Sequence, residues 1–302
     1  SVIQLSHFNY GVPTENVFTA RIGLFETTYP DSASHARFWA SIEQRLQELP
    51  GQNGVALMTS LPGLWGWQAN FSIEGKTYVS ERDYPETRRV AVTPGWFSTF
   101  GVPAVEGRIF GPGDIGGTLP VAIVTRGFAK KYFGAESPLG RRFRLGQSES
   151  KEPWLTIVGI VPDVWYDGTE NTDALRTVAF TPLAQGDYRF LSVAIAAQGD
   201  AMSFAQPVQA VVNAIDPDQP IYFTRTLADA IQRSGWFYGV FGTLFMIFGA
   251  AAQILATVGV YGVTSFAVSR HETRFRTRKS GFTTARATSS AVCVGRAKGS
   301  LR

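Results

Sequence analysis

Two stretches, far apart in the chain, share one order of hydrophobic patterns. In the first, residues 16–24 alternate apolar with polar side chains, residues 33–49 carry apolar side chains at helical spacing, and residues 54–60 are mainly apolar. Alternation is typical of a strand, and a period near about 3.6 residues is typical of a helix. The same order returns over residues 190–225, with helical spacing at residues 201–215. Each stretch therefore predicts a β-α-β unit.

The segment between these units, residues 62–188, shows short apolar runs separated by Gly and Pro. Such runs predict strands, and residues 126–133 predict one short helix. Two β-α-β units interrupted in this way predict a split ferredoxin-like module, the porter-like module, over about residues 14–61 and 189–226. The fold class is α+β, with an inserted, mostly β subdomain. The strands expected in the insertion are residues 70–73, 89–93, 120–124, 155–161 and 178–181.

The third pattern is an uncharged stretch, residues 234–269, which contains no Asp, Glu, Lys, Arg or His. A membrane-spanning helix needs about 20 largely apolar residues. The alternative is a core helix of a soluble protein, but the length of the stretch favours one transmembrane helix within residues 233–268. Gly235 and Gly239 form a small-xxx-small pair, a pattern that lets a second helix pack closely.

Aromatic and basic side chains bracket the predicted helix. Trp236 and Tyr238 stand near its start and Tyr261 near its end, where aromatic residues mark membrane interfaces. Arg270 opens a basic run after the helix, and positive residues stay on the cytoplasmic side. The predicted orientation is single-pass, with residues 1–232 extracytoplasmic and the C-terminus inside the cell.

Charge divides the chain at the same place. The sequence holds 28 basic and 24 acidic residues, and nine of the basic ones with one acid follow Ser269. A basic chain can bind nucleic acid, but the body before Ser269 is acidic, so no nucleic-acid partner is expected. Residues 269–302 are expected to form a basic, disordered cytoplasmic tail near anionic lipid. The one cysteine, Cys293, lies in this tail, and a body without cysteine suits an oxidising compartment.

Glycine and histidine motifs were candidates for chemistry. Residues 111–116 spell G-x-G-x-x-G, but a strand pattern follows and Pro112 removes a backbone donor, so a turn is expected rather than a dinucleotide site. His7, His35 and His271 do not cluster with Cys or carboxylates as metal sites and hydrolytic triads require. His7 and His35 are expected on the surface. The sequence predicts no catalytic residue, metal or cofactor, and hence no enzyme.

Acidic and aromatic residues gave two further candidates. Asp163, Asp167 and Glu170 fit no calcium-loop spacing and are expected to be solvated acids in a turn. Six aromatic residues are expected to pack the insertion, with a substrate or partner surface as the alternative. They are Trp65, Trp67, Trp96, Phe97, Trp154 and Trp165.

Several short runs follow one another in the order typical of one family. Over residues 1–268 they resemble the MacB-like periplasmic core domain joined to an FtsX-like permease helix, in particular the second half of the duplicated permeases of acidobacteria. The runs are residues 92–97, 100–103, 106–110, 120–124, 129–133, 138–141, 156–161 and 216–220.

The resemblance implies a non-catalytic permease subunit of an ABC-type export or mechanotransmission system in the bacterial inner membrane. It also implies a cytoplasmic ABC ATPase and either a second permease half or a homodimer as partners. A membrane-anchored extracytoplasmic binding or sensor module without transport activity is the alternative. A membrane-anchored hydrolase is a further one, and it would require a His or carboxylate cluster in a cleft.

Residues 269–302 depart from the family, which continues with a Glu-Ile-Gly-like cytoplasmic segment and more membrane helices. The mixture of Arg, Ser, Thr and Ala in their place favours a change of reading frame near residue 271. We therefore expect a truncated permease that lacks the surface for an ATPase. Resequencing of the coding DNA tests this expectation.

Overall fold

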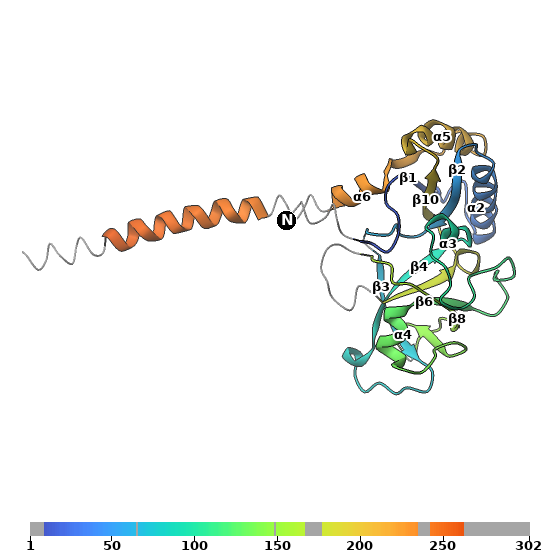
Figure 1. Cartoon of the computed structure of the whole chain (residues 1–302), viewed down its shortest axis with the longest axis horizontal. Coiled ribbons are helices and arrows are strands. Elements are labelled where there is room, and N and C mark those ends of the chain that lie inside the picture. Colours follow the sequence, from blue (N-terminus) through green and yellow to red (C-terminus); the bar gives the residue numbers. More distant parts are fainter. Residues whose placement is uncertain (1–8, 65, 148, 167–176, 235–241, 263–302) are drawn as a thin grey trace, which may run out of the picture. The chain divides into compact units, whose positions relative to one another are not determined.

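The structure has two compact units, residues 1–237 and 238–302. The first is an α+β body and the second contains one described helix (Figure 1). The structure is a computed structural model that describes residues 9–64, 66–147, 149–166, 177–234 and 242–262.

The porter-like module is built from two β-α-β units that interlock in one sheet. Its strands lie in the order β11-β1-β10-β2, and each neighbouring pair is antiparallel. This is the ferredoxin-like arrangement, so the split module predicted from the sequence is confirmed. Its elements are β1 (Val17–Gly23), α2 (Ser32–Gln47), β2 (Gln52–Met58), β10 (Phe190–Ala197), α5 (Ala205–Asn213) and β11 (Ile221–Thr226).

Helices α2 and α5 cover one face of this sheet. Asp31 caps α2 by accepting a hydrogen bond from the Ser34 amide at 2.7 Å, which satisfies one of the free donors of the first turn. Asp200 caps the 3-10 turn η4 (Ala201–Phe204), which leads into α5. The helices bury apolar stripes against Phe18, Ile22 and other sheet residues, forming the first hydrophobic core.

The inserted subdomain is rich in short strands, as predicted. A cluster of aromatic rings around Phe71, Phe128 and Phe143 fills its far end, with centroids 5.1–5.6 Å apart. Helix α4 has the predicted bounds, whereas β5, β7 and α3 were not predicted. Its elements are β3 (Trp67–Ile73), η1 (Glu81–Asp83), β4 (Glu86–Val92), α3 (Gly95–Thr99), β5 (Glu106–Gly107), β6 (Val121–Thr125), α4 (Arg126–Phe133), β7 (Arg142–Leu145), β8 (Trp154–Val161), β9 (Val178–Pro182) and η3 (Leu183–Gln185).

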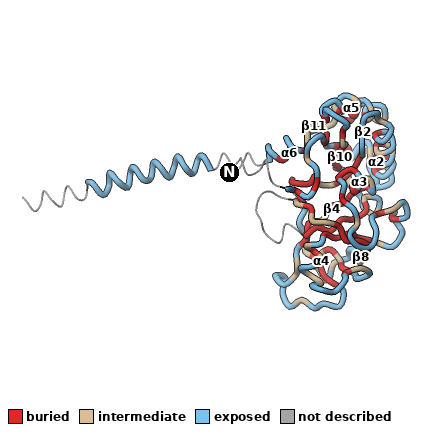
Figure 2. Tube along the Cα trace, viewed as in Figure 1, coloured by how far each residue is buried: buried red, intermediate tan, exposed pale blue. Residues whose placement is uncertain are grey.

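The two parts of the body are joined by a narrow bridge of sheet. Strands β2 and β4 pair at one register position, Met58 opposite Val92. A second hydrophobic core, the junction core, lies here and combines Ala56 and Met58 of the porter-like module with Trp96 and Phe180 of the insertion. Figure 2 shows buried residues concentrated along these central strands.

Two helices follow the porter-like module. Helix α6 (Leu227–Ser234) was not predicted, and it buries three side chains in the body. The second described helix, Gly242–Gly262, is the one described helix long and apolar enough to cross a membrane, and none of it is buried in the structure. It lies inside the range predicted for the transmembrane helix.

Candidate functional site at the subdomain junction

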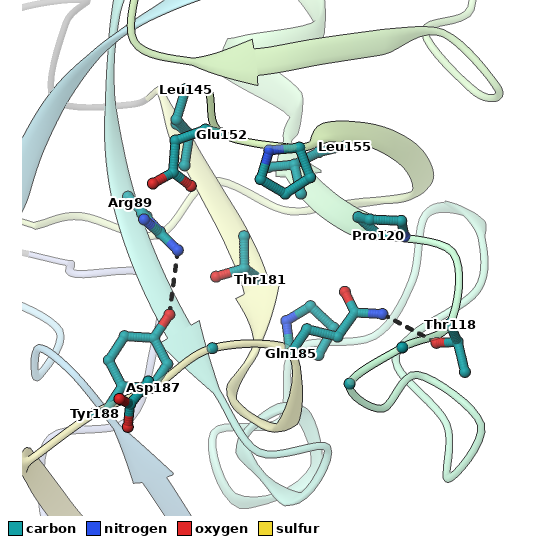
Figure 3. A pocket seen from close by; sticks show the side chains of 15 residues that line it. Arg89, Thr118, Pro120, Leu145, Glu152, Leu155, Thr181, Gln185, Asp187 and Tyr188 are labelled. Carbon is teal, nitrogen blue, oxygen red and sulfur yellow. Dashed lines mark hydrogen bonds between the residues drawn. The ribbon is translucent and has the colours of Figure 1, made fainter. Parts of the chain in front are cut away.

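Two adjoining cavities, which we call the junction groove, follow the chain where it returns from the insertion to the porter-like module. Their volumes are about 370 and 310 Å³. Both are lined by Pro182, Gly186, Asp187 and Tyr188, which lie in the connection from β9 to β10 (Figure 3). In the smaller cavity, α2 forms part of the lining and loops of the insertion form another part, so this cavity changes shape if the two parts move against each other. The larger cavity is lined by the insertion and the connection alone.

Helix α2 holds the connection from one side. His35 Nδ1 lies 2.6 Å from Asp187 Oδ1, and its Nε2 lies 3.0 Å from the Tyr29 carbonyl. Trp39 Nε1 donates to the Tyr188 carbonyl at 2.6 Å. The carboxylate and the carbonyl are both acceptors, so His35 links α2 to Asp187 on one side and to Tyr29 on the other.

The position of His35 corrects the sequence-based expectation. It was expected on the surface, but it is only 5% exposed. The ring falls on the same helical stripe as Phe38, Ile42 and Leu46, since residues three, seven and eleven positions apart share one face. That spacing was the available signal, and the distant partner Asp187 was not readable from it.

The insertion holds the same connection from the other side through Gln185. Its Oε1 accepts the Val121 amide at 3.1 Å, and its Nε2 donates to the Leu119 carbonyl at 2.9 Å. A further contact joins Nε2 to Thr118 Oγ1 at 3.3 Å (Figure 3). The connection thus bridges the two parts, with Gln185 bound to the insertion and Asp187 bound to α2.

The larger cavity has polar atoms without partners. Arg89 Nη2 donates to the Tyr188 hydroxyl at 3.3 Å (Figure 3). Arg89 Nε and Thr181 Oγ1, however, have no hydrogen-bond partner within the described residues. Buried polar atoms are nearly always paired in native proteins. Both residues line the cavity, but the two unpaired atoms are themselves buried, so a ligand in the cavity would reach them only after neighbouring side chains move.

The smaller cavity carries one carboxyl group with a perturbed pKa. Glu43 on α2 lines it, and burial raises the pKa of Glu43, an effect that a hydrogen bond to Thr93 partly opposes. A buried acid of this kind belongs to the class of groups found at functional sites. Thr93 also helps to hold β2 against the end of β4, since its Oγ1 accepts a hydrogen bond from the Leu57 amide at 3.1 Å.

The G-x-G-x-x-G segment is a turn, as expected. Asp114 within it accepts two hydrogen bonds from Arg108, at 2.6 and 2.8 Å, and one from the Gly111 amide at 2.8 Å. The Arg108 hydrogen bonds and charge hold the pKa of Asp114 below its ordinary value. The acid is therefore occupied in shaping the loop that lines the groove.

Of the other acidic and histidine candidates, the structure describes Asp163. Asp163 is not simply solvated, because its Oδ1 accepts the Gly127 amide at 2.6 Å and so caps α4. Asp167, Glu170, His7 and His271 lie outside the described residues. Within the described ranges no group of three His, Cys, Asp or Glu could hold a metal ion.

The aromatic residues divide between packing and exposure. Trp96 and Phe97 are buried in the junction core, as expected. Trp154 stacks under the Arg144 guanidinium, 4.7 Å from the ring centroid, and Trp165 packs against the junction core. Trp67 departs from the expectation, since it is 78% exposed. Trp65 lies outside the described residues.

Helix α6 enters the junction core directly. Leu227 and Ile231 belong to the same buried cluster as Trp96 and Phe180. Tyr10, near the first described residue, belongs to it as well, and burial raises the pKa of its hydroxyl. The last described helix of the body before the apolar stretch is therefore anchored in the junction core.

Most residues predicted for the membrane region lie outside the described part. These are the interface anchors Trp236, Tyr238 and Arg270 and the helix-packing pair Gly235 and Gly239. Tyr261 is described, on the helix Gly242–Gly262, where it is 74% exposed. All six assignments remain predictions.

The topology defines a class of protein: a ferredoxin-like module that is split by a strand-rich insertion and followed by an apolar helix. Residues 13–220 match the family described as MacB-like periplasmic core domain. The chain belongs to this family, and it is a periplasmic domain of the MacB/FtsX-like, ABC-type permease class. Members of the class work with a cytoplasmic ABC ATPase. A comparison with curated proteins found no match.

Solved structures share the fold at low sequence identity. The periplasmic region of MacB from Actinobacillus actinomycetemcomitans is 15% identical, with a TM-score of 0.50 over 76% of this chain and 97% of that one. A domain of a putative permease protein from Porphyromonas gingivalis is 15% identical, with a TM-score of 0.44 over 70% and 91%. The extracellular domain of the noncanonic ABC-type transporter YknZ from Gram-positive bacteria is 14% identical, with a TM-score of 0.42 over 69% and 100%.

Proposed function

We propose that the chain is a non-catalytic permease subunit whose outer domain couples membrane-helix movement to the junction groove, in export or in mechanotransmission to an envelope partner. One observation carries the proposal: α6, which leads toward the apolar stretch, buries Leu227, Ala230 and Ile231 in the body, where two of them enter the core beneath the groove.

The path from α6 to the groove is short and densely packed. Ile231 shares the junction core with Met58 and Val92, the pair that joins the two parts of the sheet. Packed interiors transmit displacement because they contain little free volume. A shift of α6 would therefore change the angle between the porter-like module and the insertion, and with it the width of the groove.

The proposed coupling also requires partners. A cytoplasmic ABC ATPase would supply the movement, and a second permease half or a second copy would pack against the membrane helix at Gly235 and Gly239. The proposed arrangement places residues 1–232 in the periplasm, a single span within 233–268 and residues 269–302 in the cytoplasm beside anionic lipid. The protein itself would need no cofactor.

Crosslinking across the groove tests the coupling. Ala40 on α2 and Ile115 on the insertion loop line opposite walls of the smaller cavity. In a Cys293→Ser background, the pair A40C/I115C is treated with a bismaleimide in membranes of a host that supplies the ATPase. We expect the crosslink yield to change between ATP and ATP with vanadate. The control pair A36C/A40C lies within one helix and should not respond; equal yields for A40C/I115C in both states would contradict the coupling.

Selective labelling tests the orientation. Cys293 is the one native cysteine, and Val79 is 96% exposed on the body. A membrane-impermeant maleimide added to spheroplasts should label Val79→Cys in the Cys293→Ser background, and should reach native Cys293 only after lysis. Labelling of Cys293 in intact spheroplasts contradicts the proposed topology.

A binding or sensor module without transport is the second candidate. The charged side chains of Arg89 and Glu152 in the lining of the larger cavity favour it, because a polar ligand could bind there without any movement between the two parts of the body. Purification of the full chain from its host distinguishes the two. A copurifying ABC ATPase supports the permease, whereas a sensor kinase or a cell-wall hydrolase supports the module.

A further inference from the structure

A third cavity, of about 300 Å³, lies on the other side of the porter-like sheet from α2 and α5. We call it the basic pocket. Three arginines line it, Arg21, Arg225 and Arg233, each from a different element. No carboxylate is among its lining residues, and none of the three arginines forms a salt bridge within the described part of the chain. The rest of the lining consists of five hydroxyl side chains, Thr19, Thr59, Ser60, Ser192 and Ser234, and five apolar ones, Ala20, Leu61, Leu64, Phe223 and Ala230.

The alternation of β1 explains why the pocket is polar. Phe18, Ala20 and Ile22 belong to the core beneath α2 and α5, so Thr19 and Arg21 emerge on the opposite face. Arg225 comes from the edge strand β11 and Arg233 from the last turn of α6. Helices α2 and α5 cover the other face of the sheet, and the basic pocket lies on this face beside α6, which supplies Ala230, Arg233 and Ser234 to its lining.

Phe223 stands at the rim in a strained backbone conformation. It is 65% exposed and has a φ of 54°, a region that costs a non-glycine residue roughly 1–2 kcal/mol. The pairing of β1 with β11 shifts register between Thr19 and Arg21, so β11 carries a bulge here. Bulges re-aim side chains, and this one sets the ring beside the Arg225 guanidinium, 5.3 Å from the ring centroid.

We propose that the basic pocket binds the phosphate of an anionic phospholipid, with Phe223 inserted among the lipid headgroups. Guanidinium groups bind phosphate through paired, charge-assisted hydrogen bonds. The hydroxyls of Thr19 and Ser234 already donate to the Arg225 and Ile231 carbonyls, so the further donors come from Ser60 and Ser192. An aromatic ring on the rim is suited to the membrane interface. Strain kept at an exposed aromatic residue is typical of functional positions.

The chain itself places this pocket within reach of a membrane. Arg233 precedes Gly242, the first residue of the apolar helix, by nine positions. Nine residues span at most about 32 Å, so a helix that crosses the bilayer keeps the basic pocket near its outer surface. A soluble anion would need neither this proximity nor Phe223. Lipid binding at this pocket does not depend on whether an ATPase drives the protein. A negative result for lipid binding would therefore leave the proposed permease function untouched.

Lipid titration of the full chain tests the site. The protein in neutral detergent is titrated with phosphatidylglycerol, phosphatidylcholine and inorganic phosphate, and bound ligand is counted by native mass spectrometry. The pocket variant is R21Q/R225Q/R233Q. The control variant is R37Q/R82Q/R126Q, which removes the same charge from exposed positions elsewhere on the body. Both retain the basic tail, so its contribution cancels.

We expect the pocket variant to bind phosphatidylglycerol roughly 10- to 100-fold more weakly, and the control variant to remain within about twofold of the native chain. Phe223→Gly should also weaken binding, by at least about threefold, without lowering thermal stability, because glycine tolerates the positive φ. Equal loss in both triple variants, equal affinity for phosphatidylcholine, or binding of inorganic phosphate without lipid would each overturn the proposal.

Discussion

Ile231 of α6 packs directly onto Gly63, at the point where the chain leaves the porter-like module for the insertion. A Cβ on Gly63 would lie 2.6 Å from Ile231 Cδ1 and 3.1 Å from a ring carbon of Tyr10. Gly63 also has a φ of 74° and donates its amide to the Trp165 carbonyl at 2.8 Å. One small residue therefore joins α6, the first described segment and the insertion.

Gly63→Ala should destabilise the body by about 2–4 kcal/mol, since the methyl group both overpacks the junction core and adopts a left-handed conformation. Chemical unfolding of the full chain in detergent, followed by tryptophan fluorescence, measures the change. Gly75→Ala is the matched control, because Gly75 has a φ of 78° with no atom within 4 Å of a Cβ. It should cost only about 1 kcal/mol. Equal losses would mean that the contact with Ile231 contributes nothing.

Asp114→Asn should lower the unfolding free energy by about 1–3 kcal/mol at neutral pH, since Asp114 accepts three hydrogen bonds, two of them from a guanidinium. The pKa of Asp114 is held below its ordinary 3.8, chiefly by Arg108. The charged form is thus favoured in the folded state, and its stabilisation is present above pH 3.8 and lost as pH falls below it. Denaturation at pH 7 and below pH 3 checks both parts. Asp218→Asn, at an exposed position, should change little at either pH.

Glu43→Gln should raise the melting temperature at pH 7 but not at pH 4. Burial raises the pKa of Glu43 above its ordinary 4.5, so the folded state binds more protons than the unfolded state just above that pH. Stability is then lost as pH rises from about 4.5 through the raised pKa, and a neutral amide avoids this loss. Melting curves at the two pH values provide the measurement. Glu48→Gln, at the exposed end of α2, is the control, and a matching rise there would refute the explanation.

Gln185→Ala should free the insertion loop from the connection. The Val121 amide loses its acceptor, Gln185 Oε1, and hydrogen exchange at Val121 should accelerate roughly fivefold, as the loss of about 1 kcal/mol of hydrogen bonding implies. Gln198→Ala removes only an exposed side-chain contact with Asn53 and should leave Val121 unchanged. Unaltered exchange in Gln185→Ala would show that the loop is held by other contacts.

More of the fold than of the candidate site could be predicted from the sequence. Strand β10 and helix α4 were predicted with the bounds that the structure shows, because Phe190–Ala197 and Arg126–Phe133 are strongly patterned and flanked by Gly or polar residues. Strand β7 was missed because Arg142–Leu145 is short and half arginine. Its place comes from pairing with β3 and β8, which is tertiary information.

Helix α6 left a signal that was not used. Leu227, Ala230 and Ile231 have helical spacing, and Thr226 caps the helix by accepting the Asp229 amide at 3.1 Å. The sequence analysis assigned the longer apolar run that follows to a membrane helix and did not separate the shorter helix before it. The junction groove, in contrast, could not be predicted, because it forms between residues such as His35 and Asp187, which only the completed sheet brings together.

The split of the ferredoxin-like module also sets an order of assembly. Strand β1 pairs with β10 and β11, with Val17 opposite Ala196 and Phe18 opposite Thr226. Contacts between such remote residues form slowly, since a long loop must close first. Strand β1 therefore waits, with open edges, until the whole insertion has emerged. During that interval the nascent chain is vulnerable to misassociation, and the last strand, β11, is the step that ends its exposure.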